Sequence, residues 1–333
     1  MRRGISRVRL ALGVLLTLAV AVLVLNWTYG RLPAEPKPTG SFVQVGKLRI
    51  HYIERPGSGT PVVLIHGLPG TAEDWEAVTP LLAGHRTIAI DRPGFGYSSG
   101  GYVPFEQQLE TIDGLLHRLD VVRPILVGHS YGGTIALGFA ERYPSEVRGL
   151  VLVDAAAGGT RPDGFEHLQA HVIKALQLPV IRQLADVTFS QLLRKVSAEL
   201  AESEAFSPQP VNAAHRRRVL AISMSNGNLQ ALAGEYLAAD AVITQVDRGL
   251  GKLRIPSVVI QGDADKFVEP ARGRRLAAML PGARLEMVFG GHMQPYDHPA
   301  AIAAAVNSLA GTSQQTFSGR RASSTPRASS AVH

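Results

Sequence analysis

A serine flanked by glycines is the residue of this sequence best placed to do chemistry: Ser130, in the pentapeptide Gly128-His129-Ser130-Tyr131-Gly132. Residues 123–127 before it are typical of a buried strand, and residues 133–140 after it are typical of a helix. A sharp turn between a strand and a helix lifts a serine hydroxyl clear of the backbone, where a base can reach it. An ordinary strand-to-helix turn has the same pattern, so the prediction of a nucleophile depends on an accompanying acid and base.

A candidate acid and a candidate base follow Ser130, each at the end of an apolar segment typical of a strand. Asp263 and Asp265 come after residues 257–262, and His292 comes after residues 283–289. A serine hydroxyl is a weak nucleophile unless a base such as His292 takes its proton during the attack. A carboxylate fixes the tautomer of the imidazole and stabilises the imidazolium that forms. These residue types therefore predict acyl transfer by a Ser-His-Asp triad.

A fourth motif precedes the other three in the chain. The loop His66-Gly67-Leu68-Pro69-Gly70 follows the apolar residues 61–65. With this loop, and with the candidate residues in the order Ser, Asp, His, residues 41–309 resemble the α/β-hydrolase superfamily, in its serine esterase and lipase-like branch. The resemblance implies that the backbone N–H groups of Leu68 and Tyr131 form an oxyanion hole for the tetrahedral intermediate.

The resemblance also distinguishes between three aspartates as the acid of the triad. The superfamily pattern places this acid three residues after the glycine that ends the strand, so Gly262 points to Asp265. Asp263 is interpreted as a turn residue. Asp154 follows the apolar residues 148–153 and would serve only in a variant that takes its acid after the sixth strand.

Four further polar residues near these motifs are interpreted as structural. His66 is expected to brace its own loop, and His129 is expected to pack within the serine turn. Asp91 and Arg92 begin a segment, residues 91–98, that also resembles the superfamily. We expect these two side chains to brace loops rather than to contact the substrate.

The order of strand and helix patterns predicts an α/β fold with a mostly parallel central sheet flanked by helices. The patterns alternate over residues 41–156 and 246–310, with an opening hairpin over 41–54 and a helix over 72–82. Over residues 157–245 the alternation gives way to helical patterns broken by prolines. The resemblance places a helical cap there, inserted after the sixth strand, over the mouth of the active site.

The predicted cap is rich in apolar residues, and two interpretations of them are open. They pack the cap onto the core, as apolar faces of helices normally do, or they form a lipophilic pocket for an acyl chain. The residues concerned are Val172, Ile173, Leu176, Leu178, Val180, Ile181, Leu184, Phe189, Leu192 and Leu193.

Composition excludes several classes of function. The net charge of +7 in 333 residues suggests an acidic partner, but seven of the 34 basic residues lie at the two ends, and the other 27 match the 27 acidic residues. A neutral body gives no sign of nucleic-acid binding. The absence of cysteine excludes thiolate catalysis and thiolate metal sites. The sequence predicts neither a cofactor nor a metal.

The amino terminus predicts attachment to a membrane. Residues 1–9 contain four arginines, and residues 10–30 are uncharged and almost wholly apolar, close to the roughly 17–25 residues that span a bilayer. Trp27 and Tyr29 lie where interfacial aromatic residues are common. The run lacks the small residues of a signal cleavage site, which favours an uncleaved anchor with the catalytic domain on the non-cytoplasmic side. Secretion after cleavage is the alternative.

The segments that flank the catalytic body have different compositions. Residues 31–40 contain three prolines and are expected to act as a semi-rigid spacer between the membrane and the body. Residues 311–333 are rich in serine, threonine and arginine and are expected to be disordered.

The resemblance implies hydrolysis of a small, lipophilic carboxylic ester through an acyl-enzyme at Ser130. His66-Gly67-Leu68-Pro69 is also similar to a motif of epoxide hydrolases and haloalkane dehalogenases, but these use an aspartate nucleophile where this chain has serine. Cofactor-free perhydrolysis and hydrolysis of carbon–carbon bonds use the same triad and are alternatives. A non-catalytic binding module on the same fold is a further alternative.

Overall fold

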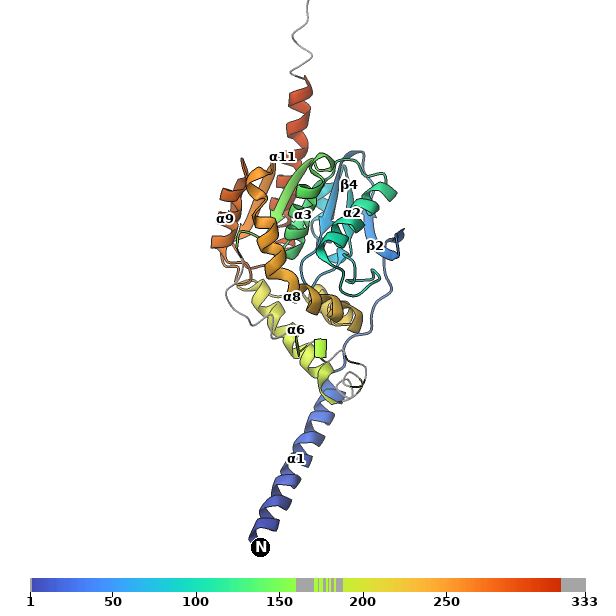
Figure 1. Ribbon diagram of the computed structural model, residues 1–333, viewed down its shortest axis with the longest axis vertical. Coiled ribbons are helices and arrows are strands. Elements are labelled where there is room, and N and C mark those ends of the chain that lie inside the picture. The colour runs from blue at the N-terminus through green and yellow to red at the C-terminus, as the bar shows by residue number, and fades with distance from the viewer. Residues whose placement is uncertain are drawn as a thin grey trace, which may run out of the picture.

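The computed structural model describes residues 2–159 and 188–318, and between these ranges residues 171, 172, 174, 175, 178, 180 and 183. Its centre is an eight-stranded sheet with the strand order β1-β2-β4-β3-β5-β6-β7-β8 (Figure 1). The strands are β1 (Ser41–Val45), β2 (Leu48–Arg55), β3 (Gly59–Ile65), β4 (His85–Ile90), β5 (Ile125–His129), β6 (Gly149–Val153), β7 (Ser257–Gly262) and β8 (Arg284–Val288).

Only the first edge of the sheet is antiparallel. β2 pairs antiparallel with β1 and with β4, whereas all pairs from β4 to β8 are parallel. Parallel strands need covered faces and therefore have continuous apolar sequences, as β5 and β6 do. The prediction of a mostly parallel sheet flanked by helices is confirmed.

Alternate residues of the strands point into two separate apolar clusters, one on each face of the sheet. Val63 and Ile65 pack with α2 (Phe105–Arg118) and α3 (Tyr131–Arg142). Val62 packs on the other face with α11 (Pro299–Ser318). Two further helices of the core are α9 (Pro270–Met279) and α10 (Gln294–Asp297). Because helices pack on both faces of the sheet, the carboxyl ends of its strands are held in position, and so are the starts of the loops that follow them.

One predicted helix differs in the structure. Residues 72–82 form two short 3₁₀ helices, η1 (Ala72–Trp75) and η2 (Thr79–Leu82), instead of one α-helix. A continuous helix would place Pro80 in its interior, where proline lacks the N–H donor and clashes with the preceding turn. The prediction of a single helix is therefore wrong.

The described part of the cap is helical and joins the core through one long helix. It contains α6 (Ser190–Phe206), α7 (Ala213–Arg218), a π-helical turn η4 (Val219–Ser223) and α8 (Asn226–Asp247). Near its start, α8 contributes Leu229 to a cap cluster around Phe95. Near its end, it contributes Val246 to the main core of the sheet. Of the region 157–245, where the sequence predicted helical patterns, residues 160–170 and most of 173–187 lie outside the described residues.

The amino-terminal helix α1 (Arg2–Tyr29) projects from the cap end of the molecule and meets the start of α6 (Figure 1). Its segment Leu10–Tyr29 has a mean hydropathy of 2.4 and is long and apolar enough to cross a membrane. At the other end of the molecule, α11 continues to Ser318, so residues 311–318 are helical where the sequence predicted disorder. Residues 319–333 lie outside the described residues.

The segment between α1 and β1, predicted to be a semi-rigid spacer, contacts the fold at several points. Leu32 packs on the cap cluster, and the Tyr97 hydroxyl donates to the carbonyl of Pro36 at 2.7 Å. The ring of His51 is hydrogen-bonded to the carbonyl of Thr39. A proline-rich segment keeps its carbonyl oxygens exposed as acceptors, and the core supplies donors for them.

Candidate active site

Ser130 occupies the tight turn between β5 and α3. Its backbone has φ of 52° and ψ of −124°, a conformation that residues other than glycine rarely adopt. Its N–H donates to the carbonyl of Val153 at 2.9 Å, which ties the turn to β6. At Gly132 a Cβ atom would collide with the carbonyl oxygens of Ile65 and His66. The glycines of the pentapeptide thus allow three segments to meet at Ser130.

His292 and Asp265 form a hydrogen-bonded pair at the carboxyl ends of β8 and β7. Nδ1 of His292 donates to Oδ2 of Asp265 at 2.8 Å. Oδ1 of the same carboxylate accepts the N–H groups of Phe267 at 2.8 Å and Val268 at 2.9 Å. Burial opposes ionisation of Asp265, but His292 and these donors hold its pKa below the ordinary value. Because Nδ1 is engaged, Nε2 of His292 is the nitrogen that can accept a proton.

The other two candidate aspartates have different partners. Asp263 accepts the N–H of Gly290 at 3.0 Å, as a turn residue would. Asp154 accepts the N–H of Gly262 at 2.8 Å. Burial and the nearby charge of Asp265 raise the pKa of Asp154 well above its ordinary value. The charged form is therefore less favourable at Asp154 than at Asp265, which makes Asp265 the better partner for an imidazolium.

His129, Asp154 and His292 have atoms of the kind that bind metals, all within 4.8 Å of one another. Nε2 of His129 donates to the carbonyl of His292 at 2.7 Å, and the two rings are 4.9 Å apart between centroids. Burial, with a smaller contribution from His292, lowers the pKa of His129 to about 3. Nε2 of His129, Oδ1 of Asp154 and Nδ1 of His292 each take part in a hydrogen bond within the protein.

The two proposed oxyanion donors lie beside the serine. Tyr131 is the first residue of α3, so its N–H has no acceptor within the helix and lies at the positive end of the helix dipole. Leu68 comes from the loop after β3, and a Cβ atom on the preceding Gly67 would lie 3.0 Å from Cβ of Ser130. Leu68, Tyr131, Ser130 and His292 line one cavity.

Arg92 holds the loop that carries Leu68. Its guanidinium donates to the carbonyls of His66 at 3.2 Å and Gly67 at 2.9 Å, and its backbone N–H donates to Nε2 of His66 at 3.0 Å. Burial and Arg92 lower the pKa of His66 to about 4, so this imidazole is neutral. Arg92 also forms a buried ion pair with Glu235 of α8, at 2.7 Å. The sequence singled out Arg92 but gave no sign of Glu235, which lies 143 residues later.

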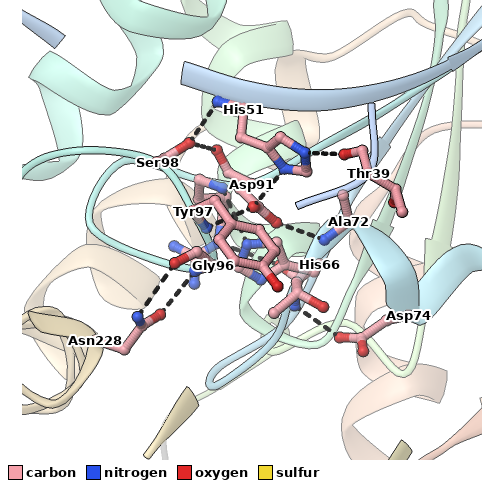
Figure 2. A network of polar contacts seen from close by, with 12 residues as sticks. Thr39, His51, His66, Ala72, Asp74, Asp91, Gly96, Tyr97, Ser98 and Asn228 are labelled. Atoms are coloured by element: carbon pink, nitrogen blue, oxygen red, sulfur yellow. Dashed lines mark hydrogen bonds and ion pairs between the residues drawn. The ribbon is translucent and has the colours of Figure 1, made fainter. Parts of the chain in front are cut away.

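Asp91 joins the loops after β3 and β4 (Figure 2). Its carboxylate accepts hydrogen bonds from the N–H groups of Ala72 at 2.6 Å and Tyr97 at 2.8 Å. It is also hydrogen-bonded to Nδ1 of His51 at 2.7 Å. Burial disfavours a charge on His51, but Asp91 and the carbonyl of Thr39 raise its pKa above the ordinary value. Asp91 therefore organises the backbone around the site without lining the cavity.

The cavity at the site has a volume of about 480 Å³, within the range of pockets for small ligands. Of the apolar cap residues that the sequence singled out, Val172 and Leu193 line it. Leu178, Val180 and Phe189 are exposed. The remaining residues of that set include Ile173, Leu176, Ile181 and Leu184, which lie outside the described residues.

A buried charged cluster forms part of the cavity wall and was not found from the sequence. His215 of α7 contacts Glu202 of α6 at 3.0 Å and Asp74 of η1 at 3.4 Å. Burial opposes a charge on His215, but the two carboxylates outweigh it and raise the pKa to about 9. The imidazolium therefore ties two cap helices to the loop that carries Leu68. Its partners lie 13 and 141 residues away, so no local pattern signals the cluster.

Comparisons with known proteins agree with this architecture. A family model described as alpha/beta hydrolase fold matches residues 60–299. The 2-hydroxy-6-oxo-2,4-heptadienoate hydrolase of Pseudomonas putida is 33% identical over 247 residues, which cover 70% of this chain and 82% of that protein. The 2-hydroxy-6-oxononadienedioate/2-hydroxy-6-oxononatrienedioate hydrolase of Paraburkholderia phymatum is 28% identical over 262 residues, 76% of this chain and 87% of that protein. The crystal structure of an enol-lactonase from Burkholderia xenovorans has a TM-score of 0.68 at 21% identity and covers 81% of this chain and 99% of its own.

Replacing Asp265 by asparagine is expected to lower kcat by about three to four orders of magnitude, because an amide can hold the imidazole in the wrong tautomer. Turnover of a water-soluble p-nitrophenyl ester measures this. Asp263→Asn is the matched control and should retain most activity, since an amide oxygen still accepts the Gly290 N–H. An inactive Asp154→Asn variant beside a nearly normal Asp265→Asn variant would show that the acid is misassigned.

The His215 cluster is expected to stabilise the protein most at low pH. The pKa of about 9 in the folded state exceeds the ordinary value of 6.5, so the contribution is complete below pH 6.5 and is lost as the pH rises to 9. The difference in Tm between the wild type and His215→Gln should therefore shrink over this interval. His117→Gln, at an exposed histidine, should show a small difference throughout. A His215 difference that grows with pH would contradict the prediction.

Proposed function

The chain belongs to the alpha/beta hydrolase family, and from that premise we propose that it is a serine hydrolase that cleaves carboxylic esters. The observation that carries the proposal is the hydrogen bond between Nδ1 of His292 and Asp265, on the same cavity as the strained turn of Ser130. It leaves Nε2 as the nitrogen that accepts a proton, and Ser130 lines the same cavity with Leu68 and Tyr131, whose backbone N–H groups are the proposed donors. This arrangement supports acyl transfer.

In the proposed reaction, Nε2 of His292 takes the hydroxyl proton of Ser130 while the serine oxygen attacks the ester carbonyl. The oxyanion that forms accepts hydrogen bonds from the N–H groups of Leu68 and Tyr131. Collapse of the intermediate breaks the bond to the alcohol, which leaves with the proton from His292. Water, deprotonated by His292, then attacks the acyl-enzyme. The bond to the serine oxygen breaks, His292 returns the proton to Ser130, and the carboxylic acid is released. Asp265 stays ionised and stabilises the imidazolium in both halves.

The cavity supports a neutral and lipophilic substrate. Among the described residues of its wall, and apart from the triad, the charges balance: Arg194, Arg272 and the protonated His215 against Asp74, Glu202 and Asp240. Apolar residues from the cap and the core form much of the remaining wall, for example Leu193, Leu232 and Ile243. A wall without net charge favours an uncharged ester with an apolar acyl chain.

Hydrolysis of a carbon–carbon bond is the second candidate, and the names of the two curated relatives favour it. Both names describe hydroxy-oxo-dienoates, which carry one or two carboxylates. A substrate of that class would need a cation or hydrogen-bond donors at each carboxylate, and Arg194 and Arg272 are the arginines among the described lining residues. Perhydrolysis uses the same triad and would add hydrogen peroxide to the acyl-enzyme in place of water.

A fluorophosphonate probe is expected to label the wild type at Ser130 and to leave Ser130→Ala unlabelled, with an almost unchanged Tm. The labelled enzyme should lose its turnover of p-nitrophenyl esters. Turnover should rise from acetyl to medium-chain esters, since each buried methylene contributes up to about 0.8 kcal/mol. An unlabelled wild type would indicate a binding module. Faster cleavage of 2-hydroxy-6-oxo-2,4-heptadienoate than of any ester would establish the second candidate instead.

The contacts of α1 support an uncleaved anchor. Asn26 is only 4% exposed, and its Oδ1 accepts the N–H of Leu192 of α6 at 2.9 Å. Nζ of Lys195 donates to the carbonyl of Tyr29 at 3.1 Å. A helix that is removed on export has no need of such contacts with the mature domain. The arginines of residues 1–9 favour a cytoplasmic amino terminus, which places the catalytic domain on the other side.

The anchor is expected to leave the whole chain in the membrane fraction after washing with carbonate or high salt. Salt releases proteins that are held by exposed charges alone, because it screens them. Mass spectrometry of the membrane-bound protein should give the full 35.6 kDa. A soluble species that begins near residue 31 would demonstrate a cleaved signal.

A further inference from the structure

The first two turns of the cap helix α6 carry apolar side chains on the surface of the molecule. Phe189, immediately before the helix, is 41% exposed, Leu193 is 45% exposed and Val196 is 44% exposed. Spacings of four and three residues place the three side chains on one face. A contiguous exposed apolar face marks an interaction surface, whereas isolated apolar residues do not.

This face begins where the anchor ends. Leu192, whose N–H donates to Oδ1 of Asn26, directly precedes Leu193. Lys195, whose Nζ donates to the carbonyl of Tyr29, directly precedes Val196. Figure 1 shows α1 meeting the start of α6, with the sheet on the far side of the cap. The apolar surface of α1 thus continues onto α6.

Contacts along the segment that follows α1, in addition to those between α1 and α6, fix the orientation of the catalytic body relative to α1. Leu32 packs on the cap cluster, and the carbonyls of Pro36 and Thr39 are bound by Tyr97 and His51 of the core. Polar contacts or packing therefore occur at intervals along the connecting segment. If α1 spans a bilayer, the start of α6 is the part of the body beside the lipid surface.

The mouth of the catalytic cavity lies in the same place. Leu193 lines the cavity and is half exposed, and the same is true of Val172, which is 45% exposed. A residue that contacts both the cavity and the solvent marks an opening. Ser130, in contrast, is buried.

We propose that the face formed by Phe189, Leu193 and Val196 rests on the bilayer surface, so that the cavity takes its substrate directly from the lipid. The substrate class is then an ester that is dissolved in the membrane, with its acyl chain entering past Leu193. This inference rests on the proposed anchoring by α1. It adds to ester hydrolysis the route by which a poorly soluble substrate reaches Ser130 without passing its chain through water.

The absence of cysteine from the chain permits a direct test. Phe189→Cys, Val196→Cys and Val122→Cys are labelled with an environment-sensitive fluorophore in the full-length protein, reconstituted into phosphatidylcholine vesicles with doxyl-labelled lipids. Val122 is the matched control, since it is 71% exposed and precedes the amino end of β5, at the opposite edge of the sheet from Ser130. Labels at 189 and 196 should be quenched about twofold more than the label at 122, because interfacial side chains enter the outer 5–10 Å or so of the bilayer.

The possible outcomes distinguish contact of the α6 face with lipid from anchoring of the chain by α1. Failure of the protein to float with the vesicles would refute the anchoring itself. Flotation with equal quenching at all three positions would refute the contact with lipid while leaving the anchor intact. Labels at 189 and 196 that are shielded from water but not quenched by doxyl lipids would assign the face to a second copy or to another segment of the chain, and would also overturn the proposal.

A second experiment tests the route of the substrate. The double variant Phe189→Gln/Val196→Gln should hydrolyse a long-chain ester dissolved in the vesicles about tenfold more slowly than the wild type, since the polar face contacts lipid poorly. Its activity on p-nitrophenyl acetate should be unchanged. Val122→Gln should match the wild type on both substrates. Equal loss on both substrates, or on neither, would contradict a lipid route, while absence of all ester turnover in the wild type would refute the proposed chemistry.

Discussion

Ser130 has a backbone conformation that residues with a side chain rarely adopt, and the surrounding chain is arranged to hold it there. Its N–H is bonded to β6, its carbonyl accepts the N–H groups of Gly133 and Ala156, and Gly132 allows the loop after β3 to approach. The bonds to Val153 and Ala156 and the approach of the loop after β3 require β3, β5 and β6 to lie side by side. The strained turn therefore depends on the parallel sheet, and the site depends on the turn, because the same geometry exposes the hydroxyl and the N–H of Tyr131.

Buried charges extend this constraint from the sheet to the cap. Arg92 contacts the loop of Leu68 and Glu235 of α8, and His215 joins the helices α6 and α7 to Asp74. A buried charge without its partner is costly, so each pair favours the closed arrangement of cap and core. The cap is thus positioned by the same residues that position the oxyanion loop. A displacement of the cap would disturb the donors of the oxyanion hole as well as the wall of the cavity.

The amino-terminal segment belongs to this arrangement. Asn26 contacts α6, and the carbonyls of Pro36 and Thr39 are bound by the core, so the helix and the catalytic body are joined along several points. A free spacer would let the body rotate relative to a membrane and would make the position of the cavity mouth irrelevant. The observed contacts fix that position beside the end of an apolar helix, which relates the proposed localisation to the proposed substrate.

The sequence by itself determined the parts of the protein that local patterns encode. Apolar segments followed by Ser130, Asp265 and His292 indicated the strands of the sheet. Because parallel strands end at the same edge, these segments also predicted that the candidate triad lies together there. The resemblance to the superfamily, applied at Gly262, singled out Asp265, the aspartate whose carboxylate accepts a hydrogen bond from His292. Only the tertiary structure decided the pairing of Arg92 with Glu235, the cluster around His215 and the contact of Asn26 with α6. Apart from the pair of His215 with Glu202, these contacts join residues more than a hundred positions apart. In the sequence their charges and amides look like those of ordinary surface residues, because only packing removes them from water.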